Sequence, residues 1–166
     1  MRRAYAFAEA AHRGQRRKDG RAFITHPVRV ARLLASRGYD EEVLAAALLH
    51  DVVEDTAITL TEDPDLPVVE RKRAYRDALR RSPHAARAIC AADKVCNLAD
   101  LHEAASSGTE QVLARFHGGL DGQVELHSDA LSMLEETDAD RALREAMRAE
   151  LGALRAQARR RGCGSA

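Results

Sequence analysis

The sequence predicts an all-α protein with a single domain. Hydrophobic residues occupy 45% of the 166 positions but aromatic residues only 4%, so alanine and leucine must fill most of the core. Both residues favour helices. Apolar positions recur at helical spacing along the chain, and no segment shows the strict alternation of a half-buried strand. A chain of this length can bury a substantial core as one domain.

The first predicted elements are two helices separated by a basic loop. Residues 3–12 carry apolar side chains at helical spacing and predict a helix. Glycines punctuate the basic segment 13–21, which predicts a loop. Pro27 suits the first position of the next helix, whose apolar face continues to Gly38. Asp40 then supplies an N-cap for the helix that follows.

The central helix ends in the sequence Leu-Leu-His-Asp-Val-Val-Glu-Asp-Thr, residues 48–56. A run of alanine and leucine precedes it, so His50 and Asp51 are expected to be carried into the interior. At roughly 100° per residue, Glu54 and Asp55 lie on the same side of the helix as this pair. Such a polar group is costly in an apolar surrounding unless something compensates it, and a divalent cation would do so. The alternative is a satisfied buried histidine followed by a solvated acidic helix end.

The rest of the chain predicts further helices joined by polar or glycine-containing segments. Serine followed by proline is typical of an N-cap and the first helical position. The expected elements are a loop over 56–67, a charged amphipathic helix over 68–81, a helix from the Ser82-Pro83 cap to about Ala105, a short helix over 109–116, a turn at Gly118-Gly119, and helices over about 120–136 and 138–160. We therefore expect one domain over residues 1–161, followed by a flexible tail over residues 162–166.

Composition and charge exclude several classes of function and of cellular compartment. Lys+Arg 26 and Asp+Glu 26 balance to zero net charge, which argues against general nucleic-acid binding. No apolar run reaches the length of a membrane span, and the amphipathic start does not resemble a signal peptide. The three cysteines form no Cys-x-x-Cys pair and no even disulfide framework. These features predict a reduced, cytoplasmic protein with no nucleic-acid or membrane partner.

Two further residues could complete a metal site with the adjacent His-Asp pair. His26 precedes a proline, so its backbone is restricted at a helix start, and Asp93 is an acid on an apolar helix. For Asp93 the alternative is a salt bridge with Lys94 or Arg87. Two imidazoles and two carboxylates suit Mn²⁺, Fe²⁺ or Zn²⁺ better than Ca²⁺. A surface or packing role is predicted for the histidines without a carboxylate at motif spacing, His84, His102, His117 and His127.

Taken in order, these motifs resemble the HD-domain phosphohydrolases, whose signature is a histidine, a His-Asp pair and a distant aspartate. The likeness is closest to the hydrolase domain of Rel/SpoT-type alarmone enzymes, and within these to the stand-alone small alarmone hydrolases. It covers roughly residues 4–135 and rests on the segments 11–20, 24–27, 50–56, 66–73 and 92–98. The resemblance implies an HD-domain helical bundle that removes the 3′-diphosphate of guanosine tetra- or pentaphosphate, leaving GDP or GTP and pyrophosphate.

The resemblance also implies a cofactor and roles for individual residues. The cofactor would be Mn²⁺ or another first-row divalent metal, held by the four residues His26, His50, Asp51 and Asp93. Glu54 and Asp55 match the acidic pair that handles the attacking water.

Four residues are expected to contact the nucleotide. Arg17 and Lys18 match the family's basic pair, and Asn97 matches an asparagine that contacts the sugar and its phosphate. Arg17 offers a planar guanidinium that can stack on a purine. Lys18 and Lys94 are point charges suited to phosphate.

Two departures from the family concern the nucleotide pocket. Thr59-Leu60 runs almost directly into the segment 61–67, whereas relatives usually have a further helix between these points. The bundle is therefore expected to lack one helix after the helix that carries His50 and Asp55. The segment 116–127 lacks the aromatic residues common there in relatives. An HD phosphohydrolase acting on another nucleotide therefore stays open as an alternative. An inactive metal-binding or alarmone-sensing domain is a further alternative, against which the presence of Glu54 and Asp55 counts.

Overall fold

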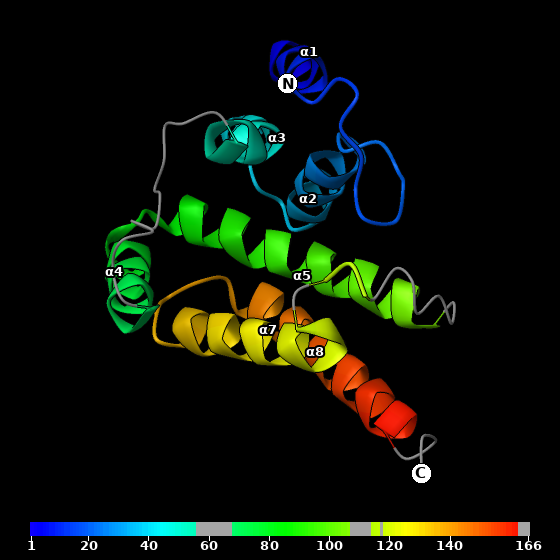
Figure 1. Cartoon of the computed structure of the whole chain (residues 1–166). Helices are drawn as coiled ribbons and strands as arrows, with labels where there is room; N and C mark the ends of the chain where they lie inside the picture. Colours follow the sequence, from blue (N-terminus) through cyan, green and yellow to red (C-terminus); the bar gives the residue numbers. More distant parts are fainter. Residues whose placement is uncertain (56–67, 107–113, 117, 163–166) are drawn as a thin grey trace.

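The computed structural model describes residues 1–55, 68–106, 114–116 and 118–162, and over these residues the chain forms seven helices and no β-strand. The predicted all-α fold is thereby confirmed. The helices are α1 (Arg2–Ala11), α2 (Thr25–Ser36), α3 (Glu41–Asp55), α4 (Val68–Arg81), α5 (His84–Ser106), α7 (Gly119–Glu135) and α8 (Arg141–Gly162). Helix α5 crosses the middle of the molecule, with α1 to α3 on one side and α7 and α8 on the other (Figure 1).

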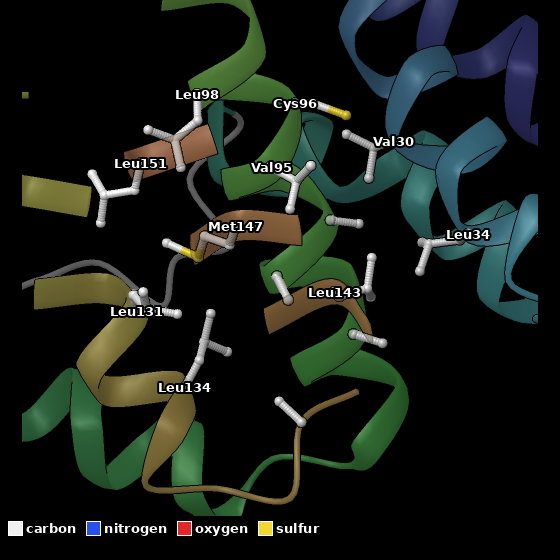
Figure 2. Close-up of a cluster of buried hydrophobic side chains, with 14 of the residues drawn as sticks. Val30, Leu34, Val95, Cys96, Leu98, Leu131, Leu134, Leu143, Met147 and Leu151 are labelled. Atoms are coloured by element: carbon white, nitrogen blue, oxygen red, sulfur yellow. The ribbon is translucent and has the colours of Figure 1, made fainter. Parts of the chain in front are cut away.

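Helix α5 forms the centre of the hydrophobic core. Val95 and Leu98 are buried on it and face the leucines and methionine of α7 and α8 (Figure 2). On another side, Cys96 lies near Val30 of α2 (Figure 2). Full burial of one large aliphatic side chain contributes about 1.5–3 kcal/mol. The same core includes the fully buried side chains Leu34, Leu134, Leu143, Met147, Leu151 and Leu154.

The starts of α2 and α3 determine where the His and Asp side chains lie. Helix α2 begins at Thr25, two residues before the predicted start, and the Thr25 hydroxyl donates to the Ala22 carbonyl at 2.7 Å. Pro27 therefore lies in the first helical turn, where its missing N–H costs nothing. The predicted cap of α3 is confirmed, because Asp40 Oδ1 accepts a hydrogen bond from the Val43 amide at 3.0 Å.

The junction between α4 and α5 differs from the prediction in detail. The Ser82 hydroxyl donates to the Leu79 carbonyl at 2.7 Å, so Ser82 closes α4 and the predicted cap on α5 was wrong. A serine hydroxyl can donate as well as accept, and here it donates to a carbonyl in the last turn of the preceding helix, which also accepts from the Ser82 amide. Pro83 precedes α5, which begins one residue later. The buried Arg87 guanidinium then donates to the Ser82 carbonyl and pairs with Asp138.

The C-terminal helices follow the predicted pattern. Gly118 and Gly119 both have positive φ, 72° and 60°, where the turn was predicted, and α7 begins at the second of them. Helix α8 begins at Arg141, and Asp140 caps it by accepting from the Leu143 amide at 2.9 Å. None of the described helices has the length and apolar character needed to cross a membrane.

Three predictions fall wholly or largely outside the described residues. These are the loop over 56–67 with its lost helix, most of the short helix over 109–116, and the tail over 162–166, of which only Gly162 is described, as the last residue of α8. Residues 114–116 are described, and they lie in a turn.

Candidate active site

The adjacent His-Asp pair meets the third predicted ligand where α2 packs against α3. His50 and Asp51 lie in the second half of α3, and His26 is the second residue of α2. One ligand atom from each of these three residues lies within 4.8 Å of the others. Asp51 bridges the two imidazoles, because its Oδ1 is 3.1 Å from His50 Nε2 and its Oδ2 is 3.7 Å from His26 Nε2. The fold thus brings two distant sequence motifs to one point.

Helix α5 adds the fourth predicted ligand. Asp93 is buried, and its Oδ1 lies 2.9 Å from His26 Nε2 and 3.8 Å from His50 Nε2. The salt bridge weighed as an alternative is also present, since Lys94 Nζ lies 2.8 Å from Asp93 Oδ2. Arg87, the other partner considered for Asp93, pairs with Asp138 instead. One carboxylate oxygen of Asp93 therefore faces the histidines and the other faces Lys94.

The donor set fits a cation. His50 Nδ1 lies 2.8 Å from the Ala47 carbonyl, and donation to that oxygen leaves Nε2 as the lone-pair nitrogen. His50 Nε2 and Asp51 Oδ2 are buried, yet neither makes a hydrogen bond to any described residue. Buried polar atoms without partners are uncommon and costly. A divalent ion between the two imidazoles and two carboxylates would satisfy them at once.

Electrostatics at the cluster favour a bound positive charge. Burial lowers the pKa of His50, but the nearby carboxylates of Asp51 and Asp93 outweigh burial and raise that pKa to about 10. Burial raises the pKa of Asp93, but Lys94 and the histidines hold it well below its ordinary value. Without a metal, the cluster therefore keeps a proton on His50 at neutral pH. A metal ion must displace that proton, because it coordinates the neutral imidazole.

The predicted substrate contacts Arg17 and Asn97 adjoin the same cluster. The Asn97 amide donates from Nδ2 to Asp93 Oδ1 at 2.8 Å. Its Oδ1 accepts a hydrogen bond from Arg17 Nη2 at 3.0 Å. Arg17 comes from the loop between α1 and α2. The Asn97 amide therefore joins that loop to the metal-type cluster, which is the group of His26, His50, Asp51 and Asp93.

The other member of the basic pair lies apart from Asn97. The Lys18 side chain is exposed, and its Nζ lies 4.2 Å from the centroid of the Phe116 ring. The Lys18 carbonyl accepts from Arg115 Nη1 at 2.8 Å. The two adjacent basic residues therefore separate, with Arg17 half-buried over α5 and Lys18 on the surface.

The remaining predicted residues are placed less completely. Glu54 and Asp55 form the last turn of α3, but their side chains lie outside the described part of the structure. His127, predicted as a packing or surface residue, is buried on α7 with its Nδ1 2.8 Å from the Gln123 carbonyl.

Sequence reasoning missed one buried carboxylate, that of Asp100. It lies beside Arg17, Arg21 and Arg29. Its position seven residues after Asp93 was the available signal, because residues at i and i+7 share a helix face.

The helical fold and this cluster are those of an HD-domain protein. The chain matches the HD domain family over residues 4–70, which contain most of α1, all of α2 and the His-Asp pair of α3. It is 39% identical over 124 residues to the guanosine-3′,5′-bis(diphosphate) 3′-pyrophosphohydrolase MESH1 of Danio rerio, covering 61% of this chain and 69% of that protein. It is 56% identical over 59 residues to the bifunctional (p)ppGpp synthase/hydrolase SpoT of Escherichia coli, covering 36% of this chain and 8% of that protein. The chain therefore belongs to the HD-domain hydrolase family of MESH1 and SpoT.

Solved structures agree with this assignment. A metazoan ortholog of SpoT that hydrolyses ppGpp superposes with a TM-score of 0.68 at 26% identity, over 90% of this chain and 92% of that one. The protein lmo0812 of Listeria monocytogenes superposes with a TM-score of 0.61 at 28% identity, over 76% of this chain and 96% of that one. The HD fold and the clustered histidines and aspartate identify a divalent-metal site.

Proposed function

We propose that the chain is a Mn²⁺-dependent hydrolase that removes the 3′-diphosphate of guanosine tetra- or pentaphosphate and yields GDP or GTP and pyrophosphate. The observation that carries this proposal is the convergence of the His50-Asp51 pair with His26 and Asp93, beside the Arg17–Asn97 contact. The similarity to MESH1 and SpoT supports the choice of substrate.

In this proposal the metal is held by His26, His50, Asp51 and Asp93. The two carboxylates neutralise a divalent charge, and the Ala47 carbonyl fixes the tautomer of His50. When bound, a divalent metal lowers the pKa of a coordinated water from about 15.7 toward neutrality and stabilises charge on phosphate oxygens. Mn²⁺ is proposed because the donor set is mixed nitrogen and oxygen, which first-row metals accept.

Glu54 and Asp55 are assigned to the attacking water. They follow the His-Asp pair by one helical turn of α3, which puts them next to a ligand in the chain. A carboxylate there orients the water, accepts its proton and relays it to the leaving group. General acid–base help of this kind contributes about 10²–10⁴ in rate. We therefore expect Glu54→Gln to keep its metal and to lose turnover by this factor.

Three of the four proposed substrate contacts are positively charged. They are needed to bind the phosphates because two carboxylate ligands neutralise the charge of the metal. Arg17 stacks on the purine and Asn97 fixes the ribose. Lys18 and Lys94 bind phosphate oxygens as point charges. Lys94 is already beside Asp93 and 30% exposed, so its ammonium can serve the ligand and a phosphate together.

The test is a nucleotide panel. Purified protein is incubated with Mn²⁺ and guanosine 3′,5′-bis(diphosphate), its adenosine counterpart and nucleoside monophosphates, and the products are identified by chromatography. We expect pyrophosphate and GDP from the guanosine alarmone, with weaker base discrimination than in relatives that have the extra helix and aromatic residues. Release of phosphate from a monophosphate, with no pyrophosphate from either alarmone, would instead support an HD phosphohydrolase of another specificity.

A further inference from the structure

Three arginines converge on the carboxylate of Asp100, whose side chain is 7% exposed. Arg17 Nη2 lies 2.9 Å from Oδ2, Arg21 Nη2 lies 2.8 Å from Oδ1, and Arg29 Nη1 also contacts Oδ1. Two of these arginines belong to the loop between α1 and α2, and the third belongs to α2 itself. One acid on α5 therefore binds two neighbouring segments of the chain.

Asp100 binds both sides of the loop tip. The Arg17 amide donates to the Arg21 carbonyl at 2.9 Å, and the residues between them form the tip, with Gly20 at φ 89°. Regular structure in this loop is limited to one isolated bridge between Arg16 and Ala22. The backbone hydrogen bonds of residues 15–23 stay within the loop and its ends, so side-chain contacts attach the loop to α5. The contacts of Arg17 and Arg21 with Asp100 are part of that attachment.

The same arginine connects Asp100 to the metal-type cluster. Arg17 Nη2 contacts both Asp100 Oδ2 and Asn97 Oδ1, and the Asn97 amide donates to Asp93 Oδ1. At roughly 100° per residue, positions 93, 97 and 100 fall within one narrow stripe of α5. Charge-assisted contacts therefore run without a break from the loop to the ligand Asp93.

We infer that Asp100 is a positioning residue for substrate binding, which holds Arg17 in the orientation that the nucleotide meets. This inference rests on the proposed function. Asp100 is not among the four metal donors, so its loss leaves the metal in place. A loop that must be ordered anew at each binding event weakens binding without changing the chemical step. The effect of Asp100 is therefore on KM, and it depends on Arg17.

The experiment is a double-mutant cycle with Asp100→Asn and Arg17→Ala, assayed with Mn²⁺ and guanosine 3′,5′-bis(diphosphate). We expect Asp100→Asn alone to raise KM about tenfold, the scale of one close ion pair between partly buried groups, with kcat changed less than about threefold. In the Arg17→Ala background the same substitution should change KM less than about twofold, because the group it positions is gone. Metal content per chain should stay the same in all variants.

Asp140→Asn is the matched control. It makes the same chemical change at another hydrogen-bonded carboxylate, and Asp140 contacts Tyr39 and the start of α8, away from the loop. We expect it to leave KM unchanged. If Asp100→Asn does not fold, the charge-balanced pair Asp100→Asn with Arg29→Met replaces it in the cycle, since it removes one positive and one negative charge together.

Amide hydrogen exchange over residues 13–23 gives a readout independent of turnover. Exchange should become faster in Asp100→Asn and stay the same in Asp140→Asn. An unchanged KM, equal KM effects in both backgrounds, or unchanged exchange in Asp100→Asn would overturn the inference. A wild-type protein that releases no pyrophosphate would overturn the proposed function itself, which is a distinct result.

Discussion

Helix α5 is buried along two opposite faces, and the two faces are built from different residues. Toward α7 and α8 it presents apolar side chains such as Val95 and Leu98 (Figure 2). Toward α2 and the basic loop it presents Asp93, Asn97 and Asp100. The apolar face stabilises the fold in proportion to the area removed from water. The polar face costs free energy unless every group is paired, and at the metal-type cluster the pairing is incomplete.

We expect the polar face of α5 to lower the free energy of unfolding of the metal-free protein, and the proposed metal ligand Asp93 lies on this face. On the apolar face a smaller side chain leaves a cavity. On the polar face, replacing a charged side chain by a smaller or neutral one removes a charge whose burial destabilises the metal-free protein. Substitutions on the two faces should therefore separate stability from metal binding.

The largest effect is expected from Asp93→Ala. Loss of one of the two carboxylates should lower metal affinity more than about 100-fold, since even partners of ligands affect affinity by 10–100-fold. Pyrophosphate release should fall with it, while the metal-free protein still folds. Metal content by elemental analysis after gel filtration is the measurement. Unchanged stoichiometry in both Asp93→Ala and Asp51→Ala would show that these residues are not ligands.

Leu98→Ala tests the opposite face of the same helix. Leu98 is fully buried, so truncation should cost about 2–5 kcal/mol of unfolding free energy through lost transfer and a residual cavity. Metal content per folded chain should stay at the wild-type value. Urea denaturation of wild type and variant, with elemental analysis of each, measures both quantities. A variant that lost its metal but kept its stability would contradict the separation of the two faces.

Metal affinity should rise with pH. The pKa of His50 in the metal-free protein is raised to about 10, so a proton occupies this imidazole throughout the neutral range and competes with the metal. Affinity is therefore expected to increase by up to tenfold per pH unit for this one proton and to level off above pH 10. The raised pKa of His50 also stabilises the metal-free fold. This contribution is complete below about pH 6.5, the ordinary pKa of histidine, and it is lost as pH rises through 10.

Titration calorimetry in two buffers with different ionisation enthalpies measures the proton released on Mn²⁺ binding. We expect about one proton per metal at pH 7.5 from His50. Binding that releases no proton at this pH would mean that the imidazole is already neutral.

The smallest effect is expected from Asp140→Ala, which lies far from the polar face of α5 in the sequence and caps α8. Loss of an N-cap costs about 0.5–2 kcal/mol. Hydrogen bonds from the Leu143 amide and the Tyr39 hydroxyl lower the pKa of Asp140 against the effect of burial. Its contribution is thus present above the unfolded pKa near 4 and is lost as pH falls through the folded value. Thermal melting at pH 7 and pH 3 should show a difference between wild type and variant that shrinks at the lower pH.

The fold was predictable because helical spacing and local caps dominate this sequence. The Asp40 cap and the bounds of α4 agree with the prediction, since both depend on neighbouring residues. Ser82 was assigned to the wrong helix because its hydroxyl can serve either the end of one helix or the start of the next. The start of α2 was placed late because no strong capping residue marks Thr25.

The metal-type cluster was predictable from motif order, but its surroundings were not. Adjacent charges in the basic loop look equivalent in sequence, yet Arg17 turns toward Asn97 while Lys18 lies over Phe116. Asp100 was missed because an acid seven residues after Asp93 is ordinary in a helix. Its three arginine partners come from segments more than seventy positions away along the chain. Such contacts arise from tertiary packing, which spacing alone does not reveal.

The most direct test of the central claim is pyrophosphate release from guanosine 3′,5′-bis(diphosphate) as Mn²⁺ is added back to protein stripped with a chelator. We predict no release from the stripped protein and a rise that saturates at one metal per chain. Release at the full rate without metal, or no release at any metal content, would contradict a metal-dependent alarmone hydrolase built on the polar face of α5.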